Sequence, residues 1–220
     1  MKHVVSRRTG SPGLDADWHG PVWGGLDALS LNGFLGSDPP AHRPRTHVKT
    51  AYDSDALHWI FRVEDRYVRA VAARHQDAVC RDSCVEFFFV PGPDIAQGYF
   101  NLEINCGGTV LFHWQPVPKR DVVVVAEADV AALGVAASLP KIVDPEIGEP
   151  TVWTVACRLP MAVLQRYAPV VAPGHGVAWR ANFYKCGDAT SHPHWLTWAP
   201  VDPSSFGFHR PDIFGELVFE

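Results

Sequence analysis

Two glutamates stand in the middle of strongly apolar runs, where a charged side chain needs a physical reason. Glu86 lies within CVEFFFV, and Glu103 lies within YFNLEIN. Both runs are rich in Phe, Val or Tyr, which is typical of β-strands, and a gap containing Pro and Gly separates them. The sequence therefore predicts two antiparallel strands joined by a loop, with one carboxylate in the middle of each.

The two carboxylates could share one face of this strand pair. Side chains alternate between the two faces of a strand, so Glu103 shares its face with Asn101 and Asn105, whereas Leu102 points the other way. If the strands pair, Glu86 can join that face. Such a face can be solvated or can pair with Arg, because half-exposed antiparallel sheets are common. The alternative is a polar face that binds a ligand.

Aromatic and polar side chains farther along the chain complete a candidate sugar site. Sugar recognition needs aromatic rings for C–H surfaces and planar polar groups for hydroxyls, converging in a concave site. A later strand, 177–186, offers polar side chains on one face and Lys185 on the other, and a Pro-rich stretch, 188–212, adds aromatic and His side chains. The candidate ligand-binding residues are Glu86, Asn101, Glu103, Asn105, Arg180, Asn182, Tyr184, Lys185, His192, His194, Trp195, Phe208 and His209. Trp179 and Trp198 are expected in the core instead.

An enzyme that processes a small sugar, as a hydrolase or a lyase, is the alternative. Glu86 and Glu103 could serve as acid and base, as paired carboxylates do in glycoside hydrolysis. His113 and the loop histidines could act as bases or metal ligands. His192 and His194 lie only two residues apart, without a defined third ligand. An enzyme predicts a raised pKa on one carboxyl group and a bell-shaped pH profile, whereas a binding module predicts neither.

Short strands must position these residues. Strand-like runs occur at 28–31, 46–52, 56–65, 68–73, 84–90, 99–105, 109–115, 121–126, 135–141, 151–159, 177–186 and 215–219. Only the stretch 160–168, with Pro at its first turn, predicts a short helix. The stretch 127–134 fits a helical turn or a loop, and 144–150 fits a turn. This pattern predicts an all-β fold, an antiparallel two-sheet β-sandwich that is jelly-roll-like, with one short helix.

Length and charge narrow the class of protein. The 220 residues are expected to form one domain, 1–220, in which 1–45 is an extended N-terminal arm pinned by Trp18 and Trp23. A net charge of −5 argues against nucleic acid or an anionic membrane as partner. No run of about 18 apolar residues is present, and the start has no apolar segment typical of a signal peptide, so a cytoplasmic location is expected. No feature predicts the oligomeric state.

The five cysteines and the absence of several motifs further limit the possible compartment, metal sites and functions. An odd number of cysteines fits free thiols in a reducing compartment. Cys80, Cys84 and Cys106 could approach one another, as buried thiols or as zinc ligands. The chain has no phosphate-binding loop, dinucleotide glycines, nucleophile elbow or EF-hand loop. A third possibility is a structural or partner-binding domain. An exposed aromatic patch around Phe206 and Phe208 would be evidence for it.

Several segments together resemble carbohydrate-binding family 9. DSCVEFFF followed by YFNLEINCGGT resembles the "DSVEIF" motif and following strand of these modules, and RANFYKCGD, SHPHWLTWAPV and FHRPDIFGEL resemble the second half of free-standing family 9-like proteins. The similarity spans Thr46 to the C-terminus. It implies a β-sandwich that binds carbohydrate, in a family associated with hydrolases, and often a structural calcium ion. Candidate calcium ligands are Asp53, Asp55 and Asp82, and no other cofactor is expected.

The resemblance is incomplete at the residues that would hold the sugar. In xylanase-borne modules of the family, two tryptophans clamp a terminal sugar. At these positions this chain has Val79 and Cys80, just before the motif, and Phe208, six residues before the closing Phe-Gly. The acidic residue of the motif matches Glu86, but Glu103 stands where the family has an arginine. We therefore expect non-catalytic binding of a small carbohydrate or sugar end in an altered pocket.

Overall fold

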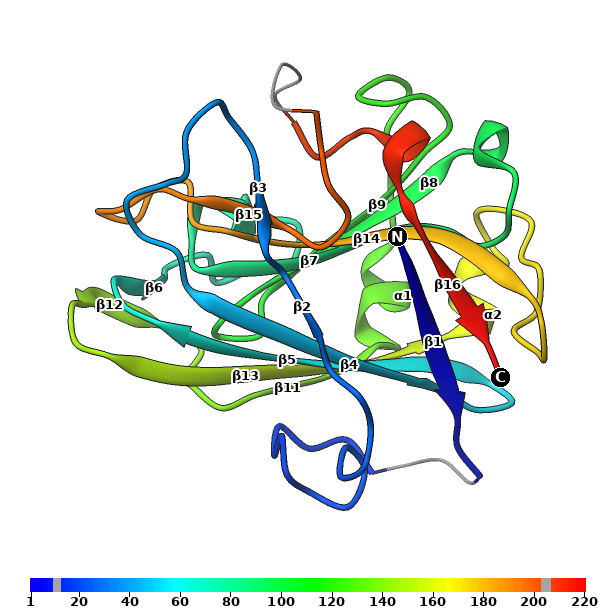
Figure 1. Ribbon diagram of the computed structural model, residues 1–220, viewed down its shortest axis with the longest axis horizontal. Coiled ribbons are helices and arrows are strands. Elements are labelled where there is room, and N and C mark those ends of the chain that lie inside the picture. Colours follow the sequence, from blue (N-terminus) through cyan, green and yellow to red (C-terminus); the bar gives the residue numbers. More distant parts are fainter. Residues whose placement is uncertain (10–12, 203–206) are drawn as a thin grey trace.

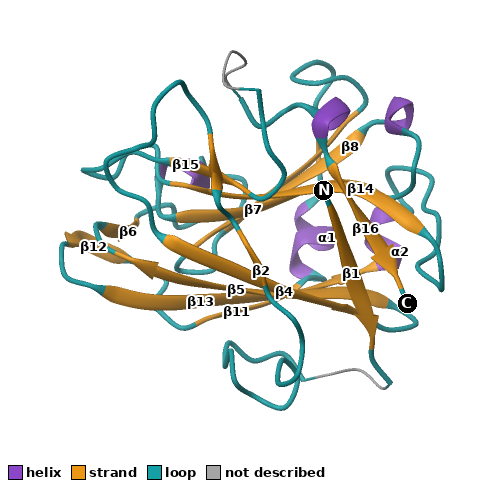
Figure 2. Ribbon diagram, viewed as in Figure 1, coloured by secondary structure: helices purple, strands orange, loops and turns teal. Residues whose placement is uncertain are grey.

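The computed structural model of the chain describes residues 1–9, 13–202 and 207–220 and is mostly β (Figures 1 and 2). The strands are β1 (Lys2–Arg7), β2 (Leu29–Ser30), β3 (Gly33–Phe34), β4 (Arg45–Tyr52), β5 (Ala56–Asp65), β6 (Val68–Ala70), β7 (Cys84–Val90), β8 (Tyr99–Asn105), β9 (Val110–Gln115), β10 (Val123–Val124), β11 (Gly134–Ala137), β12 (Val143–Ile147), β13 (Thr151–Pro160), β14 (Ala178–Cys186), β15 (Trp195–Thr197) and β16 (Gly215–Phe219). The α-helices in this part of the chain are α1 (Glu127–Ala131) and α2 (Met161–Leu164), and single 3-10 turns cover Val79–Arg81, Ile95–Gln97 and Pro211–Ile213. The all-β prediction is confirmed.

Most of the described strands belong to one curled sheet. Its order is β10-β9-β8-β7-β14-β16-β1-β4-β5-β13-β11, with β2, β3 and β15 at its sides, while β6 and β12 pair separately. Figure 1 shows two layers, one with β7, β8, β9 and β14 and the other with β4, β5, β13 and β11. Strand β1 joins the layers, because it pairs parallel with β16 and then with β4. The sheet is therefore mixed and continuous, rather than two separate antiparallel sheets as predicted.

The predicted central pair forms, and its register allows the two glutamates to share a face. Strands β7 and β8 run antiparallel, with Glu86 directly opposite Glu103 and Phe87 opposite Leu102. Strand β14 pairs on the other side of β7 and places Tyr184 opposite Glu86. Residues directly opposite each other in a sheet point to the same face. The sequence pattern thus brings both carboxylates and Tyr184 to one face.

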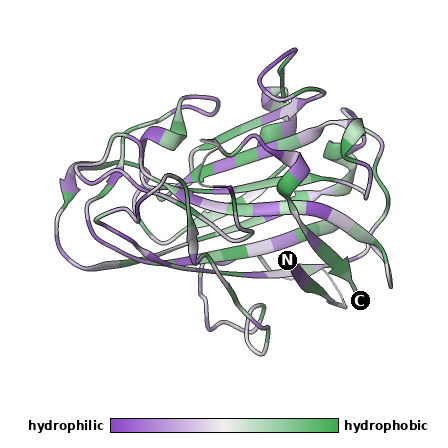
Figure 3. Cartoon of the chain, turned by 45° about the horizontal axis from the view of Figure 1, so that its top comes forward, coloured by the Kyte–Doolittle hydropathy of each residue, from purple (hydrophilic) through white to green (hydrophobic). Residues whose placement is uncertain are grey.

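Aromatic side chains from both layers meet in the core. Trp59 of β5 packs on Phe87 of β7, with 5.0 Å between ring centroids. Trp179 and Trp198 are buried in the same cluster, as predicted. Figure 3 shows hydrophobic and hydrophilic residues alternating along the strands, the pattern expected when the two faces of a sheet meet different surroundings. This core covers one face of β7, β8 and β14, and a second, smaller cluster of buried residues, including Phe88, Tyr99 and Tyr184, packs on the other face.

The N-terminal arm is tied to the layer that contains β4 and β5. Trp23 is buried against Ile60 of β5. The ammonium group of Lys49 donates hydrogen bonds to the main-chain carbonyls of Trp18 and Trp23 and lies 4.4 Å from the centre of the Trp18 ring. Both tryptophans therefore hold the arm to the sheet. No helix in the described part of the chain has the length and apolar character needed to cross a membrane.

Two local predictions were wrong. The stretch 144–150 was expected to be a turn, but β12 pairs there with β6, because Val143 is buried in the core and Ile147 packs against it. Pro145 has no N–H, and the irregular register between Val143 and Ile147 accommodates it. The described part also has two short helices rather than one, since α1 forms where a helical turn or loop was expected.

Candidate functional site

A cavity of about 150 Å³ opens on the face of β7, β8 and β14 that points away from the core. Strand β7 contributes Glu86 and Phe88, β8 contributes Glu103, and the end of β14 contributes Cys186. The remaining lining residues are Trp195 of β15, Cys80 of the 3-10 turn Val79–Arg81, and the loop residues Leu35, Asp188, Gly207, Phe208 and His209. Five predicted binding residues therefore meet in this cavity, hereafter the pocket: Glu86, Glu103, Trp195, Phe208 and His209.

The two carboxyl groups form the floor of the pocket and are almost completely buried. Glu86 is 2% exposed and Glu103 is 6% exposed. The Cys186 thiol donates to Glu86 Oε1 at 3.0 Å, and the Asn101 amide donates to Glu103 Oε1 at 2.9 Å. Among the described residues, Glu86 Oε2 has no hydrogen-bond partner. A buried acceptor without a donor is costly, so this oxygen is a place where a ligand can bind.

Burial makes it hard for both carboxyl groups to be ionised at once. Burial raises the pKa of Glu103 to about 7, against the lowering effect of the Asn101 hydrogen bond and with a smaller contribution from the charge of Asp188. Burial first, and then the neighbouring charge of Glu103, raise the pKa of Glu86 well above its usual range. Like charges in a desolvated site oppose each other. Near neutral pH the pair therefore retains at least one proton.

Aromatic side chains stand beside this floor. Phe208 stacks on Tyr184, with 4.0 Å between ring centroids, and the Tyr184 hydroxyl donates to the main-chain carbonyl of Phe208. The indole N–H of Trp195, on β15, donates to Asp188 at 2.8 Å. Tyr184 was predicted to contact ligand, but it is buried behind Phe208 and supports that ring. The pocket thus combines aromatic surfaces with a polar floor.

His209 adds a neutral imidazole to the lining. Its Nδ1 lies 2.6 Å from the Tyr99 hydroxyl. Burial first, followed by the nearby charges of Lys119 and His113, lowers the pKa of His209 to about 4. At neutral pH this imidazole is uncharged. His113 lies on β9 opposite Asn101 and is not among the residues that line the pocket.

Three predicted binding residues have structural contacts instead. Asn105 accepts hydrogen bonds from the N–H groups of Gly107 and Thr109 and so closes the turn between β8 and β9. Asn182 is buried and bonds to the main chain of Ala199. Arg180 donates to the carbonyl of Phe214. None of the three lines the pocket.

Lys185 and His194 belong to a second buried polar group, between the layers. Lys185 is fully buried, and its ammonium lies 3.4 Å from Asp65 and 2.6 Å from His194 Nε2. The Trp153 indole donates to Oδ2, the same Asp65 oxygen that faces Lys185, and His42 bonds to Oδ1. These five residues are hereafter the sealed cluster. Lys185 points into the core because it alternates with Tyr184, on the face opposite the pocket.

His192 lies outside both groups. Its ring stacks on Tyr67, with 3.6 Å between centroids, and its Nδ1 is 2.9 Å from the Ser191 hydroxyl. An exposed aromatic patch around Phe206 and Phe208 was suggested as a partner-binding surface. Phe206 lies outside the described residues, and the Phe208 side chain is only 9% exposed.

Sequence reasoning missed several lining residues. Cys186 follows Tyr184 by two positions, so the strand alternation used for Tyr184 could have found it. Asp188 and Leu35 reach the pocket from loops, and no periodic signal marks a loop residue. Cys80, in the 3-10 turn Val79–Arg81, was marked only by the family resemblance, which puts it at a sugar-clamp position.

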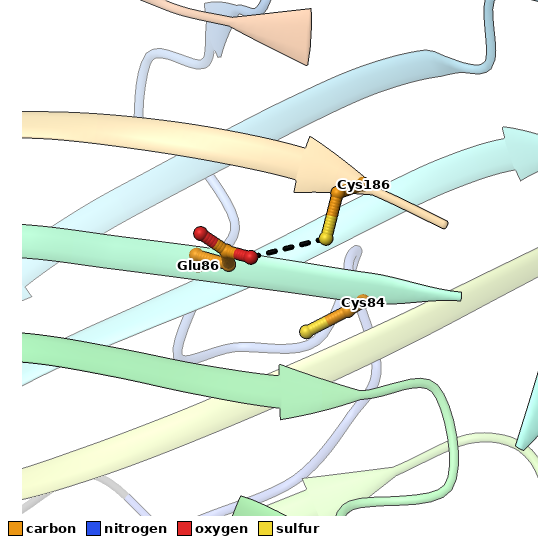
Figure 4. Close-up of side chains that lie close together, drawn as sticks. All are labelled: Cys84, Glu86 and Cys186. Carbon is orange, nitrogen blue, oxygen red and sulfur yellow. Dashed lines mark hydrogen bonds between the residues drawn. The ribbon is translucent and has the colours of Figure 1, made fainter. Parts of the chain in front are cut away.

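One group in the described residues has the composition of a metal site. Ligand atoms of Cys84, Glu86 and Cys186 all lie within 4.8 Å of one another, with Cys84 and Glu86 on one strand and Cys186 on the next (Figure 4). Two thiols and a carboxylate suit a borderline-soft ion such as zinc. Burial raises the pKa of Cys84 to about 12 and that of Cys186 well above its usual range, so a metal would have to displace these protons.

The carboxylates suggested for calcium are not part of that group. Asp53 accepts from the N–H groups of Asp55 and Ala56 and from His58, which shapes the turn between β4 and β5. Asp82 Oδ2 accepts from two main-chain N–H groups and from Asn105. These donors occupy both oxygens of Asp53 but only Oδ2 of Asp82; among the described residues, the buried Asp82 Oδ1 has no hydrogen-bond partner, and the Arg69 guanidinium is 3.9 Å from it.

Comparisons with known proteins point to one family. The sequence profile described as carbohydrate-binding family 9 matches residues 35–219. A proposed carbohydrate-binding protein from Bacteroides uniformis is 26% identical, with a TM-score of 0.88, over 100% of this chain and 99% of that one.

Two solved structures of a family 9 module from Caldicellulosiruptor kristjanssonii share the fold. The complex with cellotriose is 16% identical, with a TM-score of 0.66, covering 100% of this chain and 94% of that one. The complex with glucose is 15% identical, with a TM-score of 0.63, covering 100% and 96%. No curated protein matches this chain.

Proposed function

The chain belongs to carbohydrate-binding family 9, and we propose that it binds one small carbohydrate or sugar end in the pocket without changing it chemically. The observation that carries the proposal is the buried Glu86 Oε2, an acceptor without a donor at the floor of a cavity beside aromatic rings. The fold relatives that were solved with glucose and with cellotriose support a sugar as ligand.

The size and chemistry of the pocket suit a single sugar ring. A cavity of about 150 Å³ that is open to solvent is small, so the part of the ligand held inside it is one ring, either a monosaccharide or the end of a chain. The carboxyl groups of Glu86 and Glu103 can accept hydrogen bonds from sugar hydroxyls, and Phe208 and Trp195 offer apolar surface to C–H groups. Tyr184 holds the Phe208 ring in place, which reduces the conformational entropy lost on binding.

Calorimetric titration tests the proposal. Wild-type protein and Glu103→Gln are titrated with glucose, cellobiose, glucosamine and N-acetylglucosamine, and the sugar is recovered and analysed. Glu64→Gln is the matched control, because it makes the same change at a carboxylate of the other layer. We expect saturable wild-type binding that Glu103→Gln weakens and Glu64→Gln preserves. Failure of the folded wild type to bind any of these sugars contradicts the proposal.

One observation favours a second candidate, a sugar-processing enzyme. Glu103 has a pKa raised to about 7 beside a second buried carboxyl group, which is the tuning that general acid–base catalysis uses. Loss of sugar in the recovered mixtures, with a bell-shaped pH profile that Glu103→Gln abolishes, would favour this candidate over binding alone.

A further inference from the structure

The described lining of the pocket carries acidic groups without a matching cation. Three carboxyl groups line it, those of Glu86, Glu103 and Asp188, and no Lys or Arg is found among the described lining residues. His209 is uncharged at neutral pH, because burial lowers its pKa. A ligand in this pocket therefore meets negative or neutral groups.

The neighbouring lysines do not supply the missing charge. Lys185 lies on the opposite face of β14, and its ammonium contacts Asp65 and His194. The charge of Lys185 lowers the pKa of Glu86. This effect is smaller than the increase that burial and the charge of Glu103 cause. Lys119 approaches Gly207, with its ammonium 4.0 Å from the place where a Cβ atom would stand, and does not line the pocket. The carboxyl groups remain without a cation in contact.

An ammonium group fits this arrangement better than a hydroxyl group does. It has three donors and no acceptor, so it can bond to Glu86 Oε2 and to Glu103 at the same time. Its positive charge would let both carboxyl groups ionise, and charge-assisted hydrogen bonds are about twice as strong as neutral ones. Aromatic faces such as those of Trp195 and Phe208 also attract cations.

We infer that the ligand of this pocket is a monosaccharide, or a sugar end, that carries a free primary amine. This inference rests on the proposed function and names the class of its ligand. Acetylation of the amine would remove the charge and add bulk, and a neutral sugar would leave the carboxyl pair without a counter-charge. A 2-amino-2-deoxy sugar such as glucosamine is therefore the appropriate probe.

The test compares glucosamine, glucose and N-acetylglucosamine by calorimetry at pH 7 with EDTA present. Glucosamine should bind about tenfold more tightly than the other two sugars, or better, because its ammonium group makes charge-assisted hydrogen bonds, which are about twice as strong as neutral ones. Its binding should release protons, seen as a heat that varies with the buffer, because the carboxyl pair ionises. Glu86→Gln and Glu103→Gln should each reduce both the preference and the proton release, whereas Glu64→Gln should change neither.

Each other outcome overturns the inference. Glucose bound as tightly as glucosamine overturns it while the proposed function stands. Binding of glucosamine only when EDTA is omitted overturns it too, because a metal ion would then supply the charge. No binding of any of the three sugars to folded wild-type protein overturns both the inference and the proposed function. Circular dichroism of each variant establishes that the fold is retained.

Discussion

The sealed cluster and the pocket floor are both buried and both ionisable, but they differ in charge balance. In the sealed cluster, the Asp65 carboxylate faces the Lys185 ammonium at 3.4 Å, and His42 and Trp153 donate to it. At the pocket floor, Glu86 faces Glu103 across the strand pair, and Glu86 Oε2 has no partner among the described residues. The Asp65 carboxylate thus has a cation and hydrogen-bond donors from the protein. The carboxyl pair of the pocket floor has no cation in contact, and one of its oxygens has no donor among the described residues.

This difference separates structural residues from binding residues. A buried charge is tolerated when it is paired and hydrogen-bonded, and then it has little capacity left for a ligand. A buried carboxyl group beside another carboxyl group costs stability, and a ligand can recover that cost. Lys185 and His194 were both predicted to bind ligand, yet their polar groups are occupied within the sealed cluster.

The largest effect is expected at Lys185. The change Lys185→Met keeps much of the side-chain length but leaves Asp65 as a buried charge without its cation, which typically costs about 3–5 kcal/mol. Urea unfolding measures the loss. The double variant with Asp65→Asn should recover part of it, because the uncompensated charge is gone. A loss below about 1 kcal/mol would show that the ion pair does not hold the layers together, and the comparison would then fail.

Acid should act on the sealed cluster, and also on the pocket through His209, whose pKa is lowered to about 4. Burial first, and then the Lys185 charge, lowers the pKa of His194 to about 3. Since the unfolded chain takes up a proton near pH 6.5 and the folded chain does not, stability falls as pH drops from about 6.5 towards 3. Burial alone would raise the pKa of Asp65, but Lys185 and its hydrogen-bond donors hold it well below its usual range, so its contribution is also lost in acid.

The loss should amount to a few kcal/mol between about pH 6.5 and 4. Unfolding curves recorded across this range measure it, and His194→Gln should make the decline shallower. An equal decline in wild type and variant would assign the acid effect to other groups.

Alkali should act on the pocket floor, with the opposite sign. The folded pKa of Glu103 is raised to about 7, so the folded state binds more protons than the unfolded state between about pH 4.3 and 7. Stability from this group is present below the unfolded pKa and is lost as pH rises through about 7. Glu103→Gln should therefore stabilise the protein at pH 8 by about 1–3 kcal/mol, and much less at pH 5.

The matched control for this prediction is again Glu64→Gln, whose carboxylate forms ion pairs with Arg45 and Arg62 near the surface. It should not stabilise the protein at either pH. Destabilisation by Glu103→Gln at pH 8 would contradict the claim that the pocket floor is left incomplete without ligand.

Sequence reasoning found the floor of the pocket and three of the residues around it, Trp195, Phe208 and His209, but not the other lining residues. Strand alternation showed that Glu86 and Glu103 could share a face if their strands pair, and the register of β7 and β8 puts them there. The same reasoning placed Lys185 on the opposite face from Tyr184 but could not identify Asp65 as its partner, since β5 and β14 lie far apart in the sequence. Asp188 reaches the pocket through a loop whose path no periodicity encodes.

Local sequence patterns also could not predict that the strands form one continuous sheet. The parallel pairing of β1 with β16 joins the first residues to the last, and no nearby turn signals it. The stretch 144–150 reads as a turn because of Pro145 and Gly148, yet Val143 and Ile147 pack on the core and make it a strand edge.

The most direct test of the central claim follows the carboxyl groups themselves. Protein labelled with ¹³C at its Asp and Glu side-chain carboxyl groups is titrated with glucosamine, and the carboxyl resonances are followed by NMR. The carboxyl signals of Glu86 and Glu103 should move together and saturate, while that of Asp65 stays in place. Movement of Asp65 without Glu86 and Glu103, or no movement of any of the three at saturating sugar, would contradict the assignment of the pocket floor as the binding site.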